Sequence, residues 1–130
     1  MNTVIQTDTA PPAFSDYAQG IETPAGARWV HVSGQVGARP DGSLPDDPRL
    51  QHELAWANCI AILNAAGMGR SDIVDVLGIV TSHEGVPLFR EVRDRMLGGH
   101  FACSTLLVSG LANPDWQVEI AVRAARQDSA

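Results

Sequence analysis

The stretch WQVEIAVRA, residues 116–124, decides which fold this chain can adopt. Side chains of a β-strand point alternately to the two faces of its sheet, so these residues divide into two sets. The first set is wholly apolar, and its main members are Trp116, Val118, Ile120 and Val122. The second set is half polar, and it comprises Gln117, Glu119, Ala121 and Arg123. The strand therefore predicts a sheet with one face on a core and the other against a second subunit or lining a cleft.

Two earlier segments have helical periodicity and could cover the apolar face of that sheet. The first begins at Pro48, where Asp47 can cap the helix, and it ends at Gly67. The second begins near Pro87 and ends at the glycine pair 98–99. It has an apolar side, Leu88, Val92 and Met96, and a charged side, Arg90, Glu91, Arg93, Asp94 and Arg95. This pattern is typical of a helix that packs on one face and meets water on the other.

Other segments have the composition of strands. Tyr17 to Glu22 and Arg28 to Ser33 flank a loop with proline and glycine, which predicts a hairpin, and a short third strand can follow Gly34. Ile73 to Thr81 is too short for a helix and rich in valine and isoleucine, which favours a central strand apolar on both faces.

The last two strands, Cys103 to Ser109 and Trp116 to Ala124, are joined through a turn signal at Asn113-Pro114-Asp115. Together the segments predict an α+β fold, a two-layer sandwich of a roughly six-stranded mixed sheet with two helices on one face.

The length and composition of the chain limit the number of domains and the location that the protein can have. A chain of 130 residues fits one domain, which we expect over residues 13–126, after a loose N-terminal segment, 1–12, and before a tail, 127–130. No apolar run approaches the roughly 20 residues that a membrane span needs, and the first residues do not have the pattern of a secretory signal. We therefore expect a cytoplasmic protein that does not bind membranes.

The charged residues exclude several kinds of chemistry. All nine basic residues are arginine, so a P-loop lysine and a Schiff-base lysine are excluded. The formal net charge of −6 disfavours nucleic acid as a partner. Four histidines and two cysteines match no metal-ligand spacing, so we expect neither a metal nor another cofactor. Most of the histidines are expected on the surface or in loops, and Cys59 and Cys103 are expected as free thiols.

Three residues could carry chemistry. Glu119 interrupts an apolar strand on the face that a subunit or a cleft would cover, where a carboxylate can act as a general base on water; a solvated glutamate is the alternative. Cys103 opens a strand, and it can be either a small buried side chain or a reactive thiol. His31 shares a strand face with Ser33, and it has either a structural role or a place in the site.

Four short segments, in order and at the right spacing, resemble the RidA family, also called YjgF. Phe14 to Gly20 is similar to the family's Gly-Pro-Tyr-Ser-Gln-Ala opening, and Trp29 to Gln35 is similar to its Leu-Phe-Thr-Ser-Gly-Gln strand. Asn58 with Leu63 to Gly67 resembles the helix that ends in Ala-Gly, and Val118 to Ile120 matches the closing Val-Glu-Ile. The resemblance runs from about residue 13 to residue 125.

The resemblance implies a chorismate-mutase-like fold and a homotrimer with three clefts between subunits. In such clefts a small imine or enamine is hydrolysed to a carbonyl compound and ammonia. Carried over to this sequence, Glu119 would hold the attacking water. The residues that would line the cleft or bind substrate are Tyr17, Ser33, Gly34, Cys103, Thr105 and His31.

One position departs from the family. The family's Ala-Arg-Ser-Cys segment is Ala-Cys-Ser-Thr at residues 102–105, so Cys103 stands where an arginine would bind the substrate carboxylate, as in a branch of the family without this arginine. A thiol cannot replace a bidentate guanidinium. Either the cleft accepts another imine, anchored by His31 or an arginine such as Arg93 or Arg123, or the protein is a non-catalytic trimer that binds a small molecule.

Overall fold

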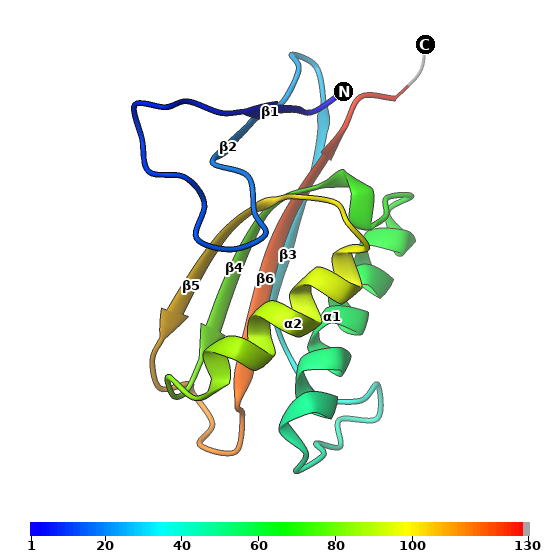
Figure 1. Cartoon of the computed structure of the whole chain (residues 1–130). Coiled ribbons are helices and arrows are strands. Elements are labelled where there is room, and N and C mark those ends of the chain that lie inside the picture. The colour runs from blue at the N-terminus through cyan, green and yellow to red at the C-terminus, as the bar shows by residue number, and fades with distance from the viewer. Residues whose placement is uncertain (129–130) are drawn as a thin grey trace.

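The computed structural model describes residues 1–128, and its core is a four-stranded sheet with two helices on one face (Figure 1). The strands lie in the order β3 (Arg28–Val36), β6 (Val118–Arg126), β4 (Ile73–Val80) and β5 (Cys103–Val108). Strands β4 and β5 are parallel, and the other neighbours are antiparallel. The predicted α+β class, with a mixed sheet and two helices on one face, is confirmed.

The helices begin and end close to the predicted residues. Helix α1 (Pro48–Ala65) has Asp47 as its N-cap, whose side chain accepts a hydrogen bond from the Leu50 amide at 3.3 Å. Helix α2 (Gly85–Leu97) starts two residues before Pro87. It ends at Gly98, whose φ of 60° is in the left-handed region that glycine adopts without steric cost.

The core lies between the helices and β4 and β6. The predicted alternation is confirmed over residues 118–122, because Val118, Ile120 and Val122 are buried, but β6 begins at Val118, so Trp116 lies before the strand. The largest fully buried side chains are Trp56, Leu63, Ile73 and Phe89. The Phe89 ring lies directly on the backbone of Gly78, where an added Cβ would overlap it. A glycine in the middle of β4 therefore sets how closely α2 approaches the sheet.

The N-terminal third differs from the prediction. Strand β1 (Thr3–Ile5) lies inside the segment expected to be loose, and it pairs antiparallel with β2 (Gly20–Glu22) in a separate two-stranded sheet. The predicted hairpin between β2 and β3 is therefore wrong. The protein has six strands, as expected, but they form two separate sheets. The short strand expected after Gly34 is a continuation of β3.

The side chain of Gln19 explains the order in this segment. Its amide nitrogen donates to the carbonyls of Thr7, at 3.2 Å, and Pro11, at 2.8 Å, and its Oε1 accepts from the Thr7 amide at 2.7 Å. A three-residue strand is too short for its own pattern to specify a partner, so these distant contacts determine the pairing.

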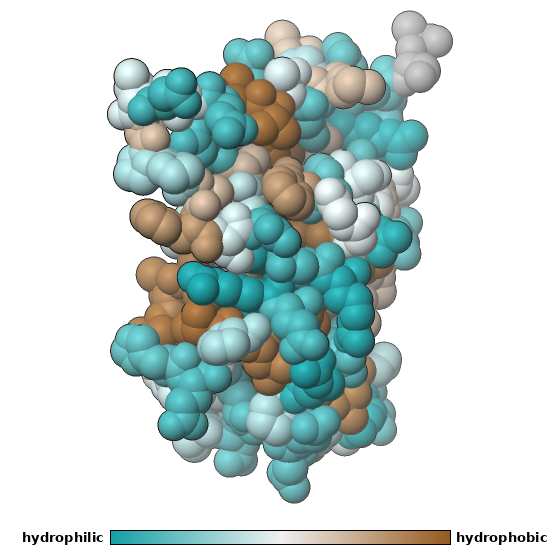
Figure 2. All heavy atoms as spheres, viewed as in Figure 1, coloured by the Kyte–Doolittle hydropathy of each residue, from teal (hydrophilic) through white to brown (hydrophobic). Residues whose placement is uncertain are grey.

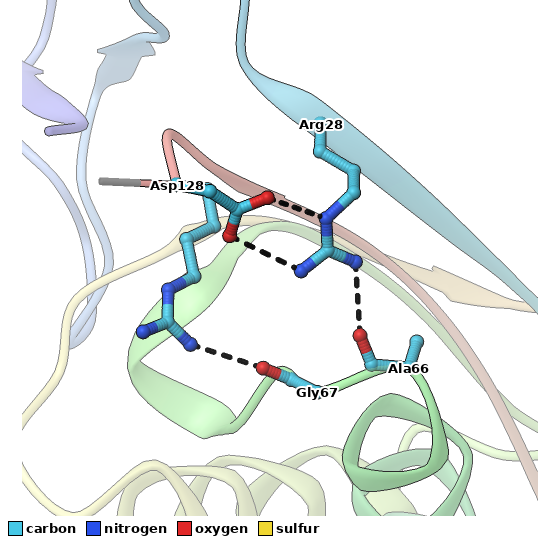
Figure 3. Close-up of polar contacts among 5 residues, drawn as sticks. Arg28, Ala66, Gly67 and Asp128 are labelled. Atoms are coloured by element: carbon cyan, nitrogen blue, oxygen red, sulfur yellow. Dashed lines mark hydrogen bonds and ion pairs between the residues drawn. The ribbon is translucent and has the colours of Figure 1, made fainter. Parts of the chain in front are cut away.

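Two arginines from neighbouring strands satisfy carbonyls at the end of α1 (Figure 3). Arg28 donates to the carbonyl of Ala66 at 2.9 Å, and Arg126 donates to that of Gly67 at 3.0 Å. Asp128 accepts from Arg28 at 3.0 Å, which lowers the pKa of its carboxyl group. The last turn of α1 is closed by its own backbone, because the amides of Gly67 and Met68 donate to the carbonyls of Asn64 and Leu63. The two arginines therefore satisfy the carbonyls that follow the helix and tie this turn to the ends of β3 and β6. Residues 129 and 130 of the expected tail lie outside the described residues.

Helix α2 presents mainly hydrophilic side chains on its outer side (Figure 2). Two of them form ion pairs with α1, Glu91 with Arg49 at 2.8 Å and Arg95 with Glu53. Arg93 does not follow the predicted pattern, because it is only 2% exposed. The expectation that the whole charged set meets water is wrong at this residue.

His52 is also buried, against the expectation for most of the histidines. It lies on α1 at 2% exposure, and its ring meets that of Phe89 edge-on, with centroids 6.1 Å apart. Burial, and to a lesser degree the charge of Arg49, lowers the pKa of His52 from 6.5 to about 4. The folded protein therefore keeps the His52 imidazole neutral as the pH falls to about 4.

This burial predicts a loss of stability in acid. Between pH 6.5 and 4 the unfolded chain binds a proton at His52 that the folded chain does not, so stability falls as the pH falls. Between pH 7.5 and pH 5 the expected contribution of His52 is about 2 kcal/mol. Urea unfolding of wild type and His52→Gln, at one protein concentration, should show a steeper pH dependence for wild type. Equal dependence in the two proteins would contradict the assignment.

Candidate functional site

The sheet face opposite the helices carries most of the predicted site residues, in rows across the strands. One row is fixed by the strand register: His31 of β3 faces Arg123 of β6, Arg123 faces Asp75 of β4, and Asp75 faces Cys103 of β5. Arg123 and Asp75 form an ion pair with an N–O distance of 3.2 Å. The open face therefore has a polar row with both signs of charge.

A hollow of about 330 Å³ lies beside this row. Its lining side chains include His31, Ser33, Asp75, Leu77, Thr105, Ala121 and Arg123. Ala121 lies between Glu119 and Arg123 on the same face of β6, and its single methyl group leaves the space open. Three of the predicted binding residues thus come together from separate strands: His31 and Ser33 from β3, and Thr105 from β5.

Glu119 lies next to this hollow, over an irregularity in β3. The register between β3 and β6 shifts between Val32 and Gln35, which is typical of a β-bulge. Inside the shift is Gly34, where an added Cβ would stand 2.8 Å from Cδ of Glu119 and closer still to Oε2. The carboxylate therefore occupies the place that a side chain at residue 34 would take.

The Glu119 side chain is half-buried, and its carboxylate oxygens are not occupied by hydrogen bonds from the described part of the chain. Within residues 1–128 it accepts no side-chain or backbone hydrogen bond and forms no ion pair. A carboxylate held by shape alone has its acceptor sites free for water or a ligand.

Cys103 shares the open face with Glu119 but lies in a different row. Glu119 faces Ile79 of β4, whereas Cys103 faces Asp75, four residues earlier on that strand. Partial burial, with the negative charge of Asp75, raises the pKa of the Cys103 thiol. The neutral thiol is thus favoured, and this argues against a reactive cysteine.

Both cysteines are free thiols, as expected. Cys59 is fully buried, its Sγ donates to the carbonyl of Ile120 at 3.5 Å, and burial raises its pKa to about 12.

Tyr17 lies elsewhere in the chain. It lines a second hollow, of about 180 Å³, with Phe14, Arg90, Arg93, Ser104 and Leu106. Its hydroxyl oxygen accepts a hydrogen bond from the Phe14 amide at 3.1 Å. Within one chain the predicted site residues therefore do not form a single site. His31, Ser33 and Thr105 line the first hollow and Tyr17 lines the second, whereas Glu119, Gly34 and Cys103 line neither.

Asp75 is the site residue that the sequence analysis missed. It is the one charged residue in the apolar strand Ile73–Val80, and an isolated acid in such a strand is the signal that could have found it. Among residues 1–128, no three His, Cys, Asp or Glu side chains gather closely enough to bind a metal ion. Neither helix is long and apolar enough to span a bilayer, within the same residues.

The fold and the open face define the class of protein: a two-layer, chorismate-mutase-like α+β domain with a carboxylate over a glycine bulge. A family model described as endoribonuclease L-PSP, which represents the RidA/YjgF proteins, matches residues 7–126. The chain therefore belongs to the RidA/YjgF family.

Sequence relatives in Escherichia coli (strain K12) agree with this membership. TdcF is 31% identical over 103 residues, which is 78% of each chain. A 2-iminobutanoate/2-iminopropanoate deaminase is 35% identical over 75 residues, which is 57% of this chain and 56% of the relative.

Solved structures have the same fold. YyfB from Yersinia pestis, a conserved Rid family protein of unknown function, superposes with a TM-score of 0.84 at 25% identity, over 96% of this chain and 98% of its own. E. coli TdcF with bound serine superposes with a TM-score of 0.72 at 29% identity, over 96% and 99%.

Proposed function

We propose that this protein hydrolyses a small imine or enamine, of still unassigned identity, in clefts between the subunits of a homotrimer. The observation that carries the proposal is the Glu119 carboxylate, which lies over the Gly34 bulge with its oxygens free to bind water. The hollow beside it has room for a small molecule among hydroxyl, imidazole and aliphatic groups.

The proposed reaction adds one water to a C=N bond. Glu119 accepts a proton from water while the water oxygen attacks the imine carbon, which gives a carbinolamine. Glu119 returns this proton to the nitrogen and then carries the proton of the carbinolamine hydroxyl to the same nitrogen, so the C–N bond breaks and ammonia leaves as the C=O bond forms. Ser33 and Thr105 would hydrogen-bond the substrate, His31 would line the cleft, and the backbone at Gly34 would anchor the reacting end.

The relatives support the reaction class. One is named for the deamination of 2-iminobutanoate and 2-iminopropanoate, and TdcF has been crystallised with serine, a small amino acid. Cys103, where an arginine would bind a carboxylate, favours a different imine or, as the second candidate, a binding protein without turnover.

A panel of imines separates these two functions. An amino-acid oxidase can generate imines from a series of amino acids, and their decay can be followed by trapping with semicarbazide. We expect this protein to accelerate the decay of at least one imine, in proportion to its concentration. If the keto products bind saturably but the decay of no imine is accelerated, the protein binds small molecules without turnover.

The homotrimer is the second part of the proposal. The open face holds exposed aliphatic side chains such as Leu77, 37% exposed, and Leu107, 47% exposed, whose burial against another copy would be favourable. We expect light scattering at micromolar concentration to give three times the mass of one chain. Leu77→Asp should dissociate the trimer, whereas Ile62→Asp, on the outer side of α1 at 39% exposure, should not. A stable wild-type monomer would overturn the trimer and its clefts.

We also infer that the protein works in the cytoplasm, because a reducing compartment preserves free thiols such as Cys59 and Cys103. Nucleic acid is not a proposed partner, since the net charge of −6 repels phosphate backbones.

A further inference from the structure

The Glu119 carboxylate depends on the backbone of two strands for its position. Within residues 1–128 no hydrogen bond or ion pair reaches its oxygens, so it has no direct support. The residues that pair with it in the sheet are Val36 of β3 and Ile79 of β4. The placement of the carboxylate over Gly34 therefore depends on how β3 and β6 are held at this height of the sheet.

The buried side chain of Gln51, on helix α1, holds the chain directly before β6. Gln51 is only 1% exposed, and its Nε2 donates to the carbonyls of Pro45, at 2.8 Å, and Asp115, at 3.2 Å. Its Oε1 accepts from the backbone amide of Gln117 at 2.9 Å. One amide group thus fixes the backbone up to two residues before the proposed general base.

The end of β3 is held against the same helix. Asn58 lies two turns after Gln51, and its Nδ2 donates to the carbonyls of Val36, at 3.1 Å, and Ala38, at 2.9 Å. Between these two residues, Gly37 approaches the helix so closely that an added Cβ would overlap the backbone of Gln51. A side chain at residue 37 would therefore push the strand and the helix apart.

The place of these contacts connects them to the proposed reaction. Sγ of Cys59 donates to the carbonyl of Ile120 at 3.5 Å, so α1 contacts the backbone of β6 on both sides of Glu119. A shift of the strand at this point would break buried hydrogen bonds and leave polar groups unpaired, which is costly. The precision matters, because a displacement of about 1 Å at a reacting group is enough to slow a reaction.

We propose that Gln51 is a positioning residue, which acts through the start of β6 to hold the Glu119 carboxylate where it activates water. This inference rests on the proposed imine hydrolysis. Gln51 is buried on the helix side of the sheet, so it does not touch a molecule bound on the open face. Loss of its hydrogen bonds should therefore lower kcat and leave KM close to that of wild type.

Gln51→Met tests this role, because methionine keeps the size of the side chain and removes its three hydrogen bonds. With the best imine of the panel, we expect kcat to fall about ten- to hundredfold. Leu63→Ala is the control, since Leu63 is also fully buried on α1 but lies near the other end of the helix. It should destabilise the fold and keep wild-type kcat. An equal fall of kcat in the two variants would overturn the proposal.

Gln51→Glu gives a second test, which follows the pH. A protonated carboxyl group can still donate to one carbonyl and accept from the Gln117 amide, whereas an ionised one would repel the carbonyls of Pro45 and Asp115. Burial raises the pKa of a carboxyl group introduced there. We expect kcat of this variant, as a ratio to wild type, to fall as the pH rises. A ratio that does not change with pH would contradict the positioning role.

A measurement without substrate separates this proposal from the proposed function. In protein labelled with ¹³C at the glutamate carboxyl groups, the Glu119 resonance is the one that Glu119→Gln removes. It should shift in Gln51→Met and stay in place in Leu63→Ala. If wild type hydrolyses no imine, the proposed function fails, and this resonance alone decides whether Gln51 places the carboxylate. An unshifted resonance in Gln51→Met would overturn the positioning role and leave the proposed function standing.

Discussion

Replacing Glu119 by glutamine should lower kcat/KM for the best imine substrate by about 10²- to 10⁴-fold, the usual contribution of a positioned general base. Glutamine keeps the size of the side chain over Gly34, so the bulge and the assembly should be retained. Its amide cannot accept a proton from water at neutral pH. The loss should therefore fall on turnover, while the unfolding midpoint and the mass in solution remain near those of wild type.

The control for this variant is Glu84→Gln, the same substitution at an exposed residue that precedes α2 and makes no capping hydrogen bond. It should keep wild-type activity. Turnover that is unchanged in Glu119→Gln would place the chemistry elsewhere and remove the central support for an imine hydrolase.

The second large effect concerns the imine of pyruvate. A charge-assisted hydrogen bond contributes about 1.5 to 3 kcal/mol, so a chain with Cys103 in place of a carboxylate-binding arginine should bind this substrate roughly tenfold to several hundredfold more weakly. The structure adds a further obstacle, because Asp75 faces Cys103 in the neighbouring strand. Its negative charge disfavours a carboxylate at that place.

Restoring the arginine should therefore recover only part of the activity. In Cys103→Arg the new guanidinium would lie beside Asp75, which competes with the substrate carboxylate for it. The double variant Cys103→Arg with Asp75→Asn should be more active on this imine than Cys103→Arg, with Asp75→Asn alone as the control. Residues 103 and 119 also lie at different heights along the sheet, next to Asp75 and Ile79 of β4. A carboxylate bound at residue 103 can therefore hold the imine carbon away from the water at Glu119, and a displacement of about 1 Å is enough to slow the reaction.

The measurement is a coupled assay that generates the imine from serine and follows its disappearance. The four proteins should be compared with the E. coli 2-iminobutanoate/2-iminopropanoate deaminase under the same conditions. If wild type already matches that enzyme, the missing arginine is irrelevant and the argument from position 103 is wrong.

The layer arrangement could be predicted because it depends on local periodicity. The alternation over residues 118–122 and the caps at Asp47 and Gly98 each act within a few residues, and the structure follows them. The common face of Glu119, Ala121 and Arg123 followed from the same alternation.

What could not be predicted depends on contacts between distant residues. The charged pattern of α2 places Arg93 outside, but Ser15 and Ser104, far away in the sequence, provide it with buried partners. The pairing of Asp75 with both Arg123 and Cys103 depends on strand register, which no single strand specifies. His52 is buried because α2 brings Phe89 over it, a consequence of how two helices pack.

The contact of the Glu119 carboxylate with the backbone of Gly34 links two positions that are 85 residues apart in the sequence. We therefore expect the two positions to evolve together. Any side chain at residue 34 would displace the carboxylate, so selection on the acid also acts on the glycine. In diverging copies of this gene, the two positions should therefore be lost together. A descendant chain that keeps an acid at 119 but has gained a side chain at 34 would mark a lineage in which the carboxylate has been redirected.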